Sequence, residues 1–223
     1  MLVFAKQRLI IYSMPKTGTT SIDKALEKNA TIRFAKSKKF GLKHISPSDF
    51  QKWQEVLAMQ FPGKKFESCC IMREPIDWIR SWYKYRSREV IKNQKTFTGD
   101  ITFDQYLKSF CEKEVPTKSL LNQQSRYLFP KKKILIDRIF PYEKFNLFLD
   151  YLTEKIGQKI EIENKNISPK VEENKLIIKE DTLKMIKKYI SLDQKIYSQI
   201  IELGSFDSNN KKHKILFNEI LRT

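Results

Sequence analysis

The segment of this chain that best predicts its architecture reads Leu9-Ile10-Ile11-Tyr12-Ser13-Met14-Pro15-Lys16-Thr17-Gly18-Thr19-Thr20-Ser21. Its first four residues form a short β-branched and aromatic run, which is typical of a buried strand in an α/β sheet. From Ser21 onward the apolar residues recur at helical spacing, at Ile22, Ala25 and Leu26. The segment therefore predicts a strand, a tight loop and a helix, in that order.

A loop between a strand and a helix start can form a site for anions. The first N–H groups of a helix have no partners within the helix, and they lie at the positive end of its dipole. Gly18 lets the backbone approach a phosphate closely, and Lys16 adds a mobile positive charge. Hydroxyl donors come from Thr19, Thr20 and Ser21. The plainer alternative is an ordinary turn capped by Thr or Ser.

The order of residues separates this loop from the best-known phosphate-binding loop. In the nucleoside-triphosphate P-loop the lysine follows the second glycine, whereas Lys16 precedes the only glycine here. Pro15-Lys16-Thr17-Gly18-Thr19-Thr20-Ser21 instead resembles the 5′-phosphosulfate-binding loop of sulfotransferases that use 3′-phosphoadenosine-5′-phosphosulfate (PAPS). The resemblance implies that these residues, from Pro15 through Thr17 to Ser21, bind that end of the cosubstrate.

A second motif follows the apolar run 66–72. Arg73-Glu74-Pro75 ends this expected strand and begins a helix, where proline at the first turn loses no hydrogen bond. Arg73, Ser81 and Tyr83 have the spacing of the 3′-phosphate motif of the same family, which implies that Arg73 and Ser81 bind the 3′-phosphate. Arginine suits this role because its guanidinium binds phosphate in a bidentate way. The alternative is a structural ion pair for Arg73 and a packing role for Ser81.

Weaker likenesses support the two motifs by their order along the chain. Gln124-x-x-Tyr127-Leu128 resembles an element of carbohydrate-type sulfotransferases, although a packed helix end is the plainer reading of Tyr127 and Leu128. Family-like spacings also occur at Asn166-x-Ser168 and at Tyr189, Asp193 and Tyr197. One departure is Trp78, which stands where many members of the family have arginine.

The resemblance extends from Leu9 to about Tyr197, nearly the whole chain. It implies an α/β, P-loop-like three-layer fold with a central parallel β-sheet flanked by helices, as a single sulfotransferase domain over residues 1–223. The nucleotide would lie beyond the carboxyl ends of the strands.

The implied reaction moves the sulfuryl group of PAPS to an acceptor hydroxyl on a sugar or glycan and releases adenosine 3′,5′-bisphosphate. Lys16 is the expected cation on the bridging oxygen, where negative charge develops. His44 is the candidate catalytic base, because an ordinary histidine pKa near 6.5 suits proton abstraction at neutral pH. A glutamate base and a capping role for His44 remain open. The reaction needs no metal, and no metal-ligand spacing is present.

Charge favours an acidic partner. Lys and Arg number 43 against 26 Asp and Glu, a net charge of +17. Such a surface attracts nucleotides, acidic glycans, nucleic acid or anionic lipids, although it can also be only a solvated lysine-rich face. Two alternatives to the sulfotransferase are a non-catalytic basic nucleotide- or RNA-binding protein and a small-molecule kinase on the same fold. No RNA-recognition motif is visible, and the Walker lysine and aspartate positions are missing.

Cysteine usage and hydropathy suggest a location. Cys69 and Cys70 are neighbours on an expected strand, where their side chains point to opposite faces, so they should not form a disulfide. No apolar stretch approaches the ~20 residues of a membrane span. The chain enters its first strand without room for a signal peptide. We therefore expect a cytoplasmic protein.

Overall fold

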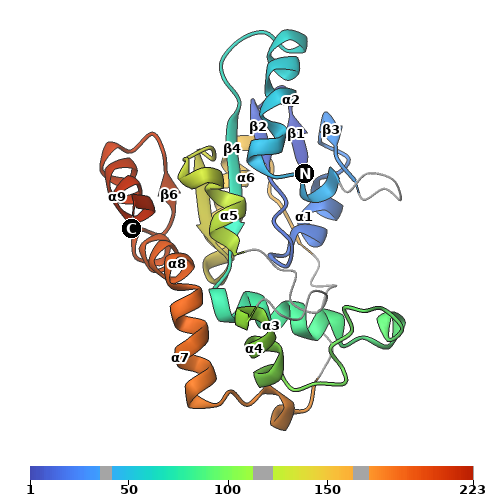
Figure 1. The fold of residues 1–223 in the computed structure, drawn as a ribbon. Coiled ribbons are helices and arrows are strands. Elements are labelled where there is room, and N and C mark those ends of the chain that lie inside the picture. Colours follow the sequence, from blue (N-terminus) through green and yellow to red (C-terminus); the bar gives the residue numbers. More distant parts are fainter. Residues whose placement is uncertain (36–41, 113–122, 163–170, 223) are drawn as a thin grey trace.

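The structure is a computed structural model that describes residues 1–35, 42–112, 123–162 and 171–222 (Figure 1). Within these ranges the strands are β1 (Leu2–Phe4), β2 (Leu9–Ile11), β3 (Ile32–Arg33), β4 (Glu67–Met72), β5 (Arg138–Pro141) and β6 (Phe206–Asp207). The helices are α1 (Thr19–Leu26), α2 (Pro47–Gln60), α3 (Pro75–Arg86), α4 (Phe103–Glu112), α5 (Gln124–Leu128), α6 (Phe145–Ile156), α7 (Glu180–Tyr189), α8 (Ser191–Leu203) and α9 (Lys211–Arg222).

The strands form one mixed sheet in the order β3-β1-β2-β4-β5-β6. Its three central strands, β2, β4 and β5, run parallel, with Ile11 opposite Cys69 and Cys69 opposite Arg138. The outer strands β1, β3 and β6 pair antiparallel. The expected α/β class is confirmed, and the expectation of a parallel sheet holds for its centre. The antiparallel edges escape the sequence patterns because these strands are too short to show a period, and β1 joins β2 by a tight turn.

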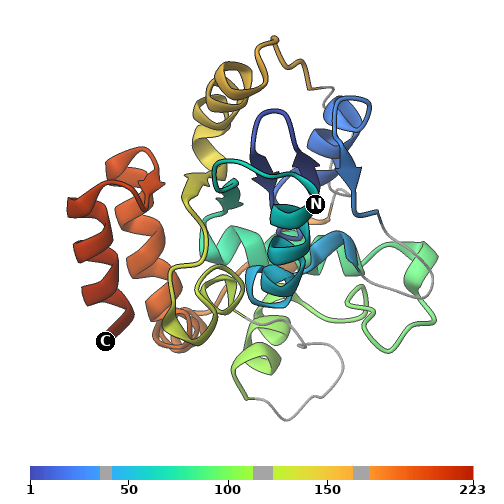
Figure 2. The same cartoon turned by 90° about the horizontal axis from the view of Figure 1, so that it is seen from above.

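Helices cover both faces of the sheet, as Figure 2 shows from above. Helices α1 and α6 pack on one face, against Leu9, Ile11 and Cys69. Helices α2, α5, α8 and α9 pack on the other face, against Ile10 and Cys70. The alternation of side chains along each strand thus supplies two cores, each of which removes apolar surface from water. Cys69 and Cys70 belong to different cores and both are free buried thiols, which confirms that they form no disulfide.

A third apolar cluster joins α3, α4 and α7 beyond the carboxyl end of β4 (Figure 1). Its buried members from these three helices include Trp78, Tyr83, Tyr106 and Ile186. The loops that follow β2 and β4 therefore lie between the sheet and this cluster. None of the helices in the described ranges is both long and apolar enough to cross a lipid bilayer.

The apolar run from Ile134 to Phe140 predicts a third strand from the sequence, but β5 begins only at Arg138. Asp137 pairs with β4 through its side chain, since its Oδ2 accepts hydrogen bonds from the Ser68 amide at 2.8 Å and the Ser68 hydroxyl at 2.7 Å. A side chain thus occupies the place of the first ladder bond. The apolar residues before Asp137 give no sign of this side-chain pairing, so the apolar pattern alone places the start of the strand too early.

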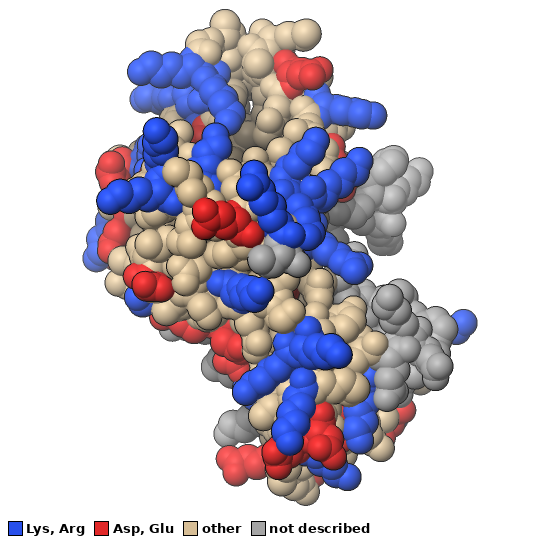
Figure 3. Space-filling view, turned by 60° about the vertical axis from the view of Figure 1, so that its left-hand side comes forward, with Lys and Arg blue, Asp and Glu red and all other residues tan. Residues whose placement is uncertain are grey.

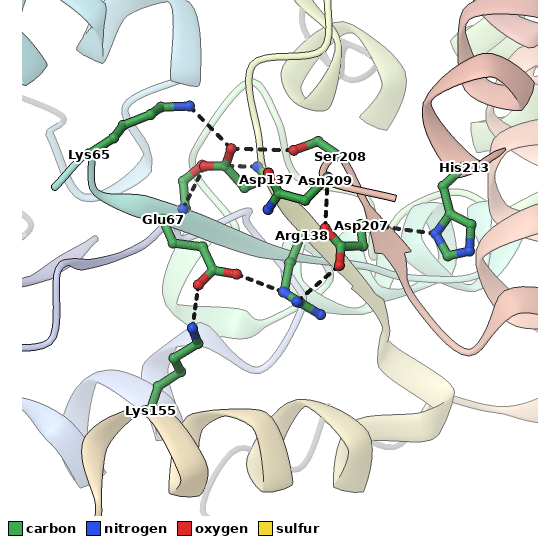
Figure 4. A network of polar contacts seen from close by, with 10 residues as sticks. Lys65, Glu67, Asp137, Arg138, Lys155, Asp207, Ser208, Asn209 and His213 are labelled. Carbon is green, nitrogen blue, oxygen red and sulfur yellow. Dashed lines mark hydrogen bonds and ion pairs between the residues drawn. The ribbon is translucent and has the colours of Figure 1, made fainter. Parts of the chain in front are cut away.

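A polar network surrounds the amino ends of β4 and β5 and the carboxyl end of the antiparallel strand β6 (Figure 4). Glu67 accepts from Arg138 Nε at 2.7 Å and from Lys155 Nζ at 2.5 Å, which links both neighbouring strands and α6. Arg138 also bonds Asp207 on β6 at 2.9 Å. The network holds the starts of β4 and β5 and the end of β6 together, at the end of the sheet opposite to the loop after β2.

Candidate functional site

The loop after β2 has an unusual backbone. Lys16 has a φ of +67° and Gly18, which caps α1, has a φ of +74°. A Cβ atom on Gly18 would lie 3.3 Å from the Tyr142 ring and 3.4 Å from the Phe145 ring. Both the backbone conformation and the lack of space therefore favour glycine at position 18. Lys16 has a left-handed backbone conformation, which costs energy in a residue other than glycine and is often found in functional loops.

The polar residues of the loop divide into two groups. Thr17 is fully buried and its hydroxyl donates to the Met14 carbonyl at 2.9 Å, so this side chain closes the loop on itself. Thr19, Thr20 and Ser21 occupy the first turn of α1, where Thr20 is exposed and lies 3.4 Å from Lys43 Nζ. Pro15 contributes its carbonyl to a tertiary contact. Of the expected phosphate ligands, the Thr17 hydroxyl alone has a clear structural use within the loop.

The second motif lies directly against the first. Arg73 Nη1 is 3.4 Å from the Lys16 carbonyl oxygen, and Trp78 Nε1 donates to the Pro15 carbonyl at 2.8 Å. Trp78, which replaces an expected arginine, thus supports the loop as α3 passes beneath it. Ser81 is 5% exposed and lies one helical turn after Trp78, so the two residues occupy neighbouring positions on α3. The structure therefore brings together the two segments that the sequence separates.

The side chain of Arg73 has few polar partners among the described residues. Its guanidinium lies 4.7 Å from the Tyr142 ring centroid, which orients it by a cation–π contact. Its Nε is buried without a hydrogen-bond partner among the described residues. Over the same residues no carboxylate forms an ion pair with Arg73, so the structural ion pair considered above is not observed. An unsatisfied buried N–H is costly, and a bound phosphate oxygen would remove that cost.

A cationic group adjoins the loop at the end of α3. Lys16 Nζ lies 4.4 Å from the Tyr85 ring centroid, and Arg88 Cζ lies 3.7 Å from the same centroid. Burial, followed by the charges of Arg88 and Arg73, lowers the pKa of Lys16 from its ordinary value to about 8. Like charges held this close favour a bound anion. The sequence analysis did not identify Tyr85 or Arg88. The signal available was their position, four and seven residues after Ser81, which corresponds to about one and two helical turns.

His44 is tied to the start of the loop. Its Nδ1 lies 2.6 Å from the Ser13 carbonyl, so in the neutral ring Nδ1–H donates this bond and Nε2 remains an acceptor. Partial burial outweighs that hydrogen bond and lowers the pKa of His44 from its ordinary value. The next residue is anchored as well, because the Tyr127 hydroxyl donates to the Ile45 carbonyl at 2.9 Å. A neutral imidazole whose Nε2 has no hydrogen-bond partner among the described residues suits a base.

The groups gathered here fit a ligand with two anionic groups. They comprise a helix start, two guanidinium groups, an ammonium group and several hydroxyls, all of which donate hydrogen bonds. Over the described residues, no three His, Cys, Asp or Glu side chains are placed to hold a metal ion. Asn166 and Ser168, also named in the sequence analysis, lie outside the described residues.

A hollow lies at the end of the sheet opposite to the Lys16 loop. It has a volume of about 230 Å³ and is lined in part by Gln51, Gln54, Lys65, Asp137 and Lys214. Its carboxylate, Asp137, is already bonded to Ser68, Lys65 and Ser208 within the network of Figure 4. This hollow therefore belongs to the polar network and not to the groups around the Lys16 loop.

Positive charge is also spread over the outside of the protein. On the face drawn in Figure 3, which brings the left-hand side of Figure 1 forward, Lys and Arg side chains predominate over Asp and Glu and gather mainly in the upper half. This distribution agrees with the net charge of +17 and with acidic partners.

Comparison with models of known protein families and with curated protein sequences finds no match to this chain.

Proposed function

We propose that this protein is a PAPS-dependent sulfotransferase with a P-loop-like fold. The observation that supports this most is the contact between Arg73 and the Lys16 loop, since one ligand can reach both. PAPS has an anionic phosphosulfate at one end and a phosphate on the 3′ oxygen of its ribose. Two adjoining groups of donors without carboxylate partners, among the described residues, match such a molecule better than one with a single anionic end.

The residues divide the work as follows. The amide groups at the start of α1 bind the 5′-phosphate together with Thr19, Thr20 and Ser21. Arg73 and Ser81 bind the 3′-phosphate. Lys16 neutralises the charge on the oxygen that bridges sulfur and phosphorus as that S–O bond breaks and the S–O bond to the acceptor forms. The leaving group is adenosine 3′,5′-bisphosphate.

His44 removes the proton of the acceptor hydroxyl through Nε2, which has no partner within the described part of the chain. Its lowered pKa keeps the ring neutral at pH 7, the form that accepts a proton. The acceptor that best agrees with the positive surface and the likeness around Gln124 is a hydroxyl of a sugar or acidic glycan. The two buried thiols, Cys69 and Cys70, suit the reducing cytoplasm that we propose as the location.

Thermal unfolding with nucleotides tests the proposal. At ~100-fold over Kd, adenosine 3′,5′-bisphosphate should add about 2.7 kcal/mol of stability. For a chain of this size this raises Tm by roughly 5–10 °C. Stabilisation by ATP–Mg²⁺ alone would favour the kinase instead, and binding to RNA that weakens steeply with salt would favour the non-catalytic alternative. Transfer from labelled PAPS to sugars, glycans, phenols and small alcohols would then identify the acceptor.

A further inference from the structure

Helix α5 touches the backbone of the strand end that presents Arg73. The side-chain amide of Gln124 makes two hydrogen bonds with the backbone of Arg73. Its Oε1 accepts from the Arg73 N–H at 3.0 Å, and its Nε2 donates to the Arg73 carbonyl at 2.8 Å. Gln124 is 1% exposed, so water does not compete for these bonds. The amide pairs with Arg73 as a neighbouring strand would, and this restricts the backbone from which the guanidinium extends.

Helix α5, which contains Gln124, is itself held by a residue of helix α8. The Asp193 carboxylate on α8 accepts hydrogen bonds from the backbone N–H of Gln124 at 2.8 Å and from the backbone N–H of Ser125 at 3.0 Å. Asp193 is 2% exposed and supplies the acceptors that the first N–H groups of α5 otherwise lack. Contacts therefore run from α8 through α5 to Arg73.

The guanidinium has few other restraints. Its hydrogen bond to the Lys16 carbonyl is long, at 3.4 Å, and its contact with Tyr142 limits tilt more than position. The direction in which Arg73 leaves the sheet must consequently come from its backbone. Glu143 supports the next residue, where its Oε1 accepts from the Glu74 N–H at 3.0 Å, but Gln124 alone of the described residues binds both backbone groups of Arg73.

We propose that Gln124 is a positioning residue that makes the site selective for nucleotides with a 3′-phosphate. This inference rests on the proposed function, because it takes Arg73 as the ligand of that phosphate. Gln124 itself touches no ligand. It acts by holding Arg73 in the one orientation in which the guanidinium meets the 3′-phosphate, so that little ordering is left for the binding step.

The test compares two nucleotides that differ only in the 3′-phosphate. Affinities for adenosine 3′,5′-bisphosphate and adenosine 5′-monophosphate are measured by calorimetry on the wild-type protein and on Gln124→Met, which keeps the shape and removes both hydrogen bonds. We expect the variant to bind the bisphosphate about tenfold more weakly, corresponding to about 1.4 kcal/mol, and the monophosphate within about twofold of wild type. Gln124→Glu keeps the oxygen that accepts from Arg73 N–H, so its loss should be smaller, about threefold.

Gln123→Met is the matched control. Gln123 is the adjacent residue, and its amide donates to the Tyr189 carbonyl rather than to Arg73. Loss of this bond should lower Tm without changing the preference for the bisphosphate. A general loosening of α5 would change both variants alike and would overturn the inference.

The remaining outcomes separate the two proposals. If wild type prefers the bisphosphate and both Gln124→Met and Gln124→Glu keep that preference in full, the positioning role is wrong while the proposed function stands. If wild type binds both nucleotides equally, the proposed function is wrong and this inference with it. Should Gln124→Met fail to fold, Gln124→Glu decides between these outcomes.

Discussion

The guanidinium of Arg73 lies 3.4 Å from the backbone carbonyl of Lys16, although 57 residues separate the two in the sequence. The contact places two segments rich in hydrogen-bond donors beside one another, each at the end of a parallel strand. A ligand with two anionic groups matches this pair of segments.

Lys16→Ala should lower turnover at saturating PAPS by about 100-fold, as the loss of one charge-stabilising group in a transition state typically does. Much of the nucleotide affinity should remain, because the amides of α1 and the second motif are untouched. Single-turnover transfer from labelled PAPS measures the rate, and calorimetry with adenosine 3′,5′-bisphosphate measures the binding. An unchanged rate would remove Lys16 from the mechanism.

The same lysine predicts an alkaline limb in the pH profile. Its pKa is lowered to about 8 in the protein without ligand, so kcat/KM for PAPS should fall above about pH 8 as the ammonium loses its proton. Bound phosphates should raise this pKa, so the limb in kcat should lie at higher pH. Lys16→Arg, which stays charged, should remove the limb from both profiles. A limb of the same position in Lys16→Arg would show that another group titrates.

Arg88→Ala should weaken binding of the bisphosphate roughly tenfold, because it removes one of the cations that surround Tyr85. It should also raise the pKa of Lys16, since the charge of Arg88 helps to lower it. Calorimetry over a pH series reports both effects. Lys84→Ala, in the last turn of α3, removes an equal charge and should change affinity far less; equal effects of the two variants would indicate only a general influence of net charge.

His44→Gln should lower turnover by about 100-fold or more with a hydroxyl acceptor and should abolish the acidic limb of kcat/KM. In wild type this limb should lie below pH 6.5, because partial burial lowers the pKa of His44. Glutamine retains a donor for the Ser13 carbonyl, so the turn should keep its structure. A near-normal rate at neutral pH would refute the role of His44 as the base and leave a carboxylate as the candidate.

Glu67→Gln should destabilise the protein by about 1 kcal/mol at pH 7 without changing nucleotide affinity. Burial opposes ionisation of Glu67, but hydrogen bonds from Lys155 and Arg138 outweigh it, so the pKa of Glu67 is lowered. Because the pKa of Glu67 is lower in the folded state than in the unfolded state, ionised Glu67 stabilises the fold at a pH above its unfolded-state pKa. This stability is lost as the pH falls through the folded-state pKa. Urea unfolding should therefore show a gap between wild type and variant that is full at pH 7 and narrows below about pH 4. A gap that is constant with pH would contradict the ion-pair account.

Much of the framework could be predicted from local patterns. The strand, loop and helix around Lys16 and Gly18 could be predicted because β-branched runs, helical spacing and glycine act over a few neighbouring residues. Helix α3 after Pro75 follows from the same reasoning. The short edge strands could not, since two or three residues show no period and pair only because the central strands are already in place.

The site divides in the same way. Residues 15–21, Arg73 and Ser81 could be proposed from the order of residue types, as could the candidate base His44. The sequence by itself determined which donors each segment holds. Only the tertiary structure decided that Arg73 contacts the Lys16 loop, that Arg88 adjoins the loop through Tyr85, and that Gln124 binds the backbone of Arg73. These contacts depend on which strands lie side by side in the sheet, and no local pattern along the chain encodes the distance between segments that are far apart in the sequence.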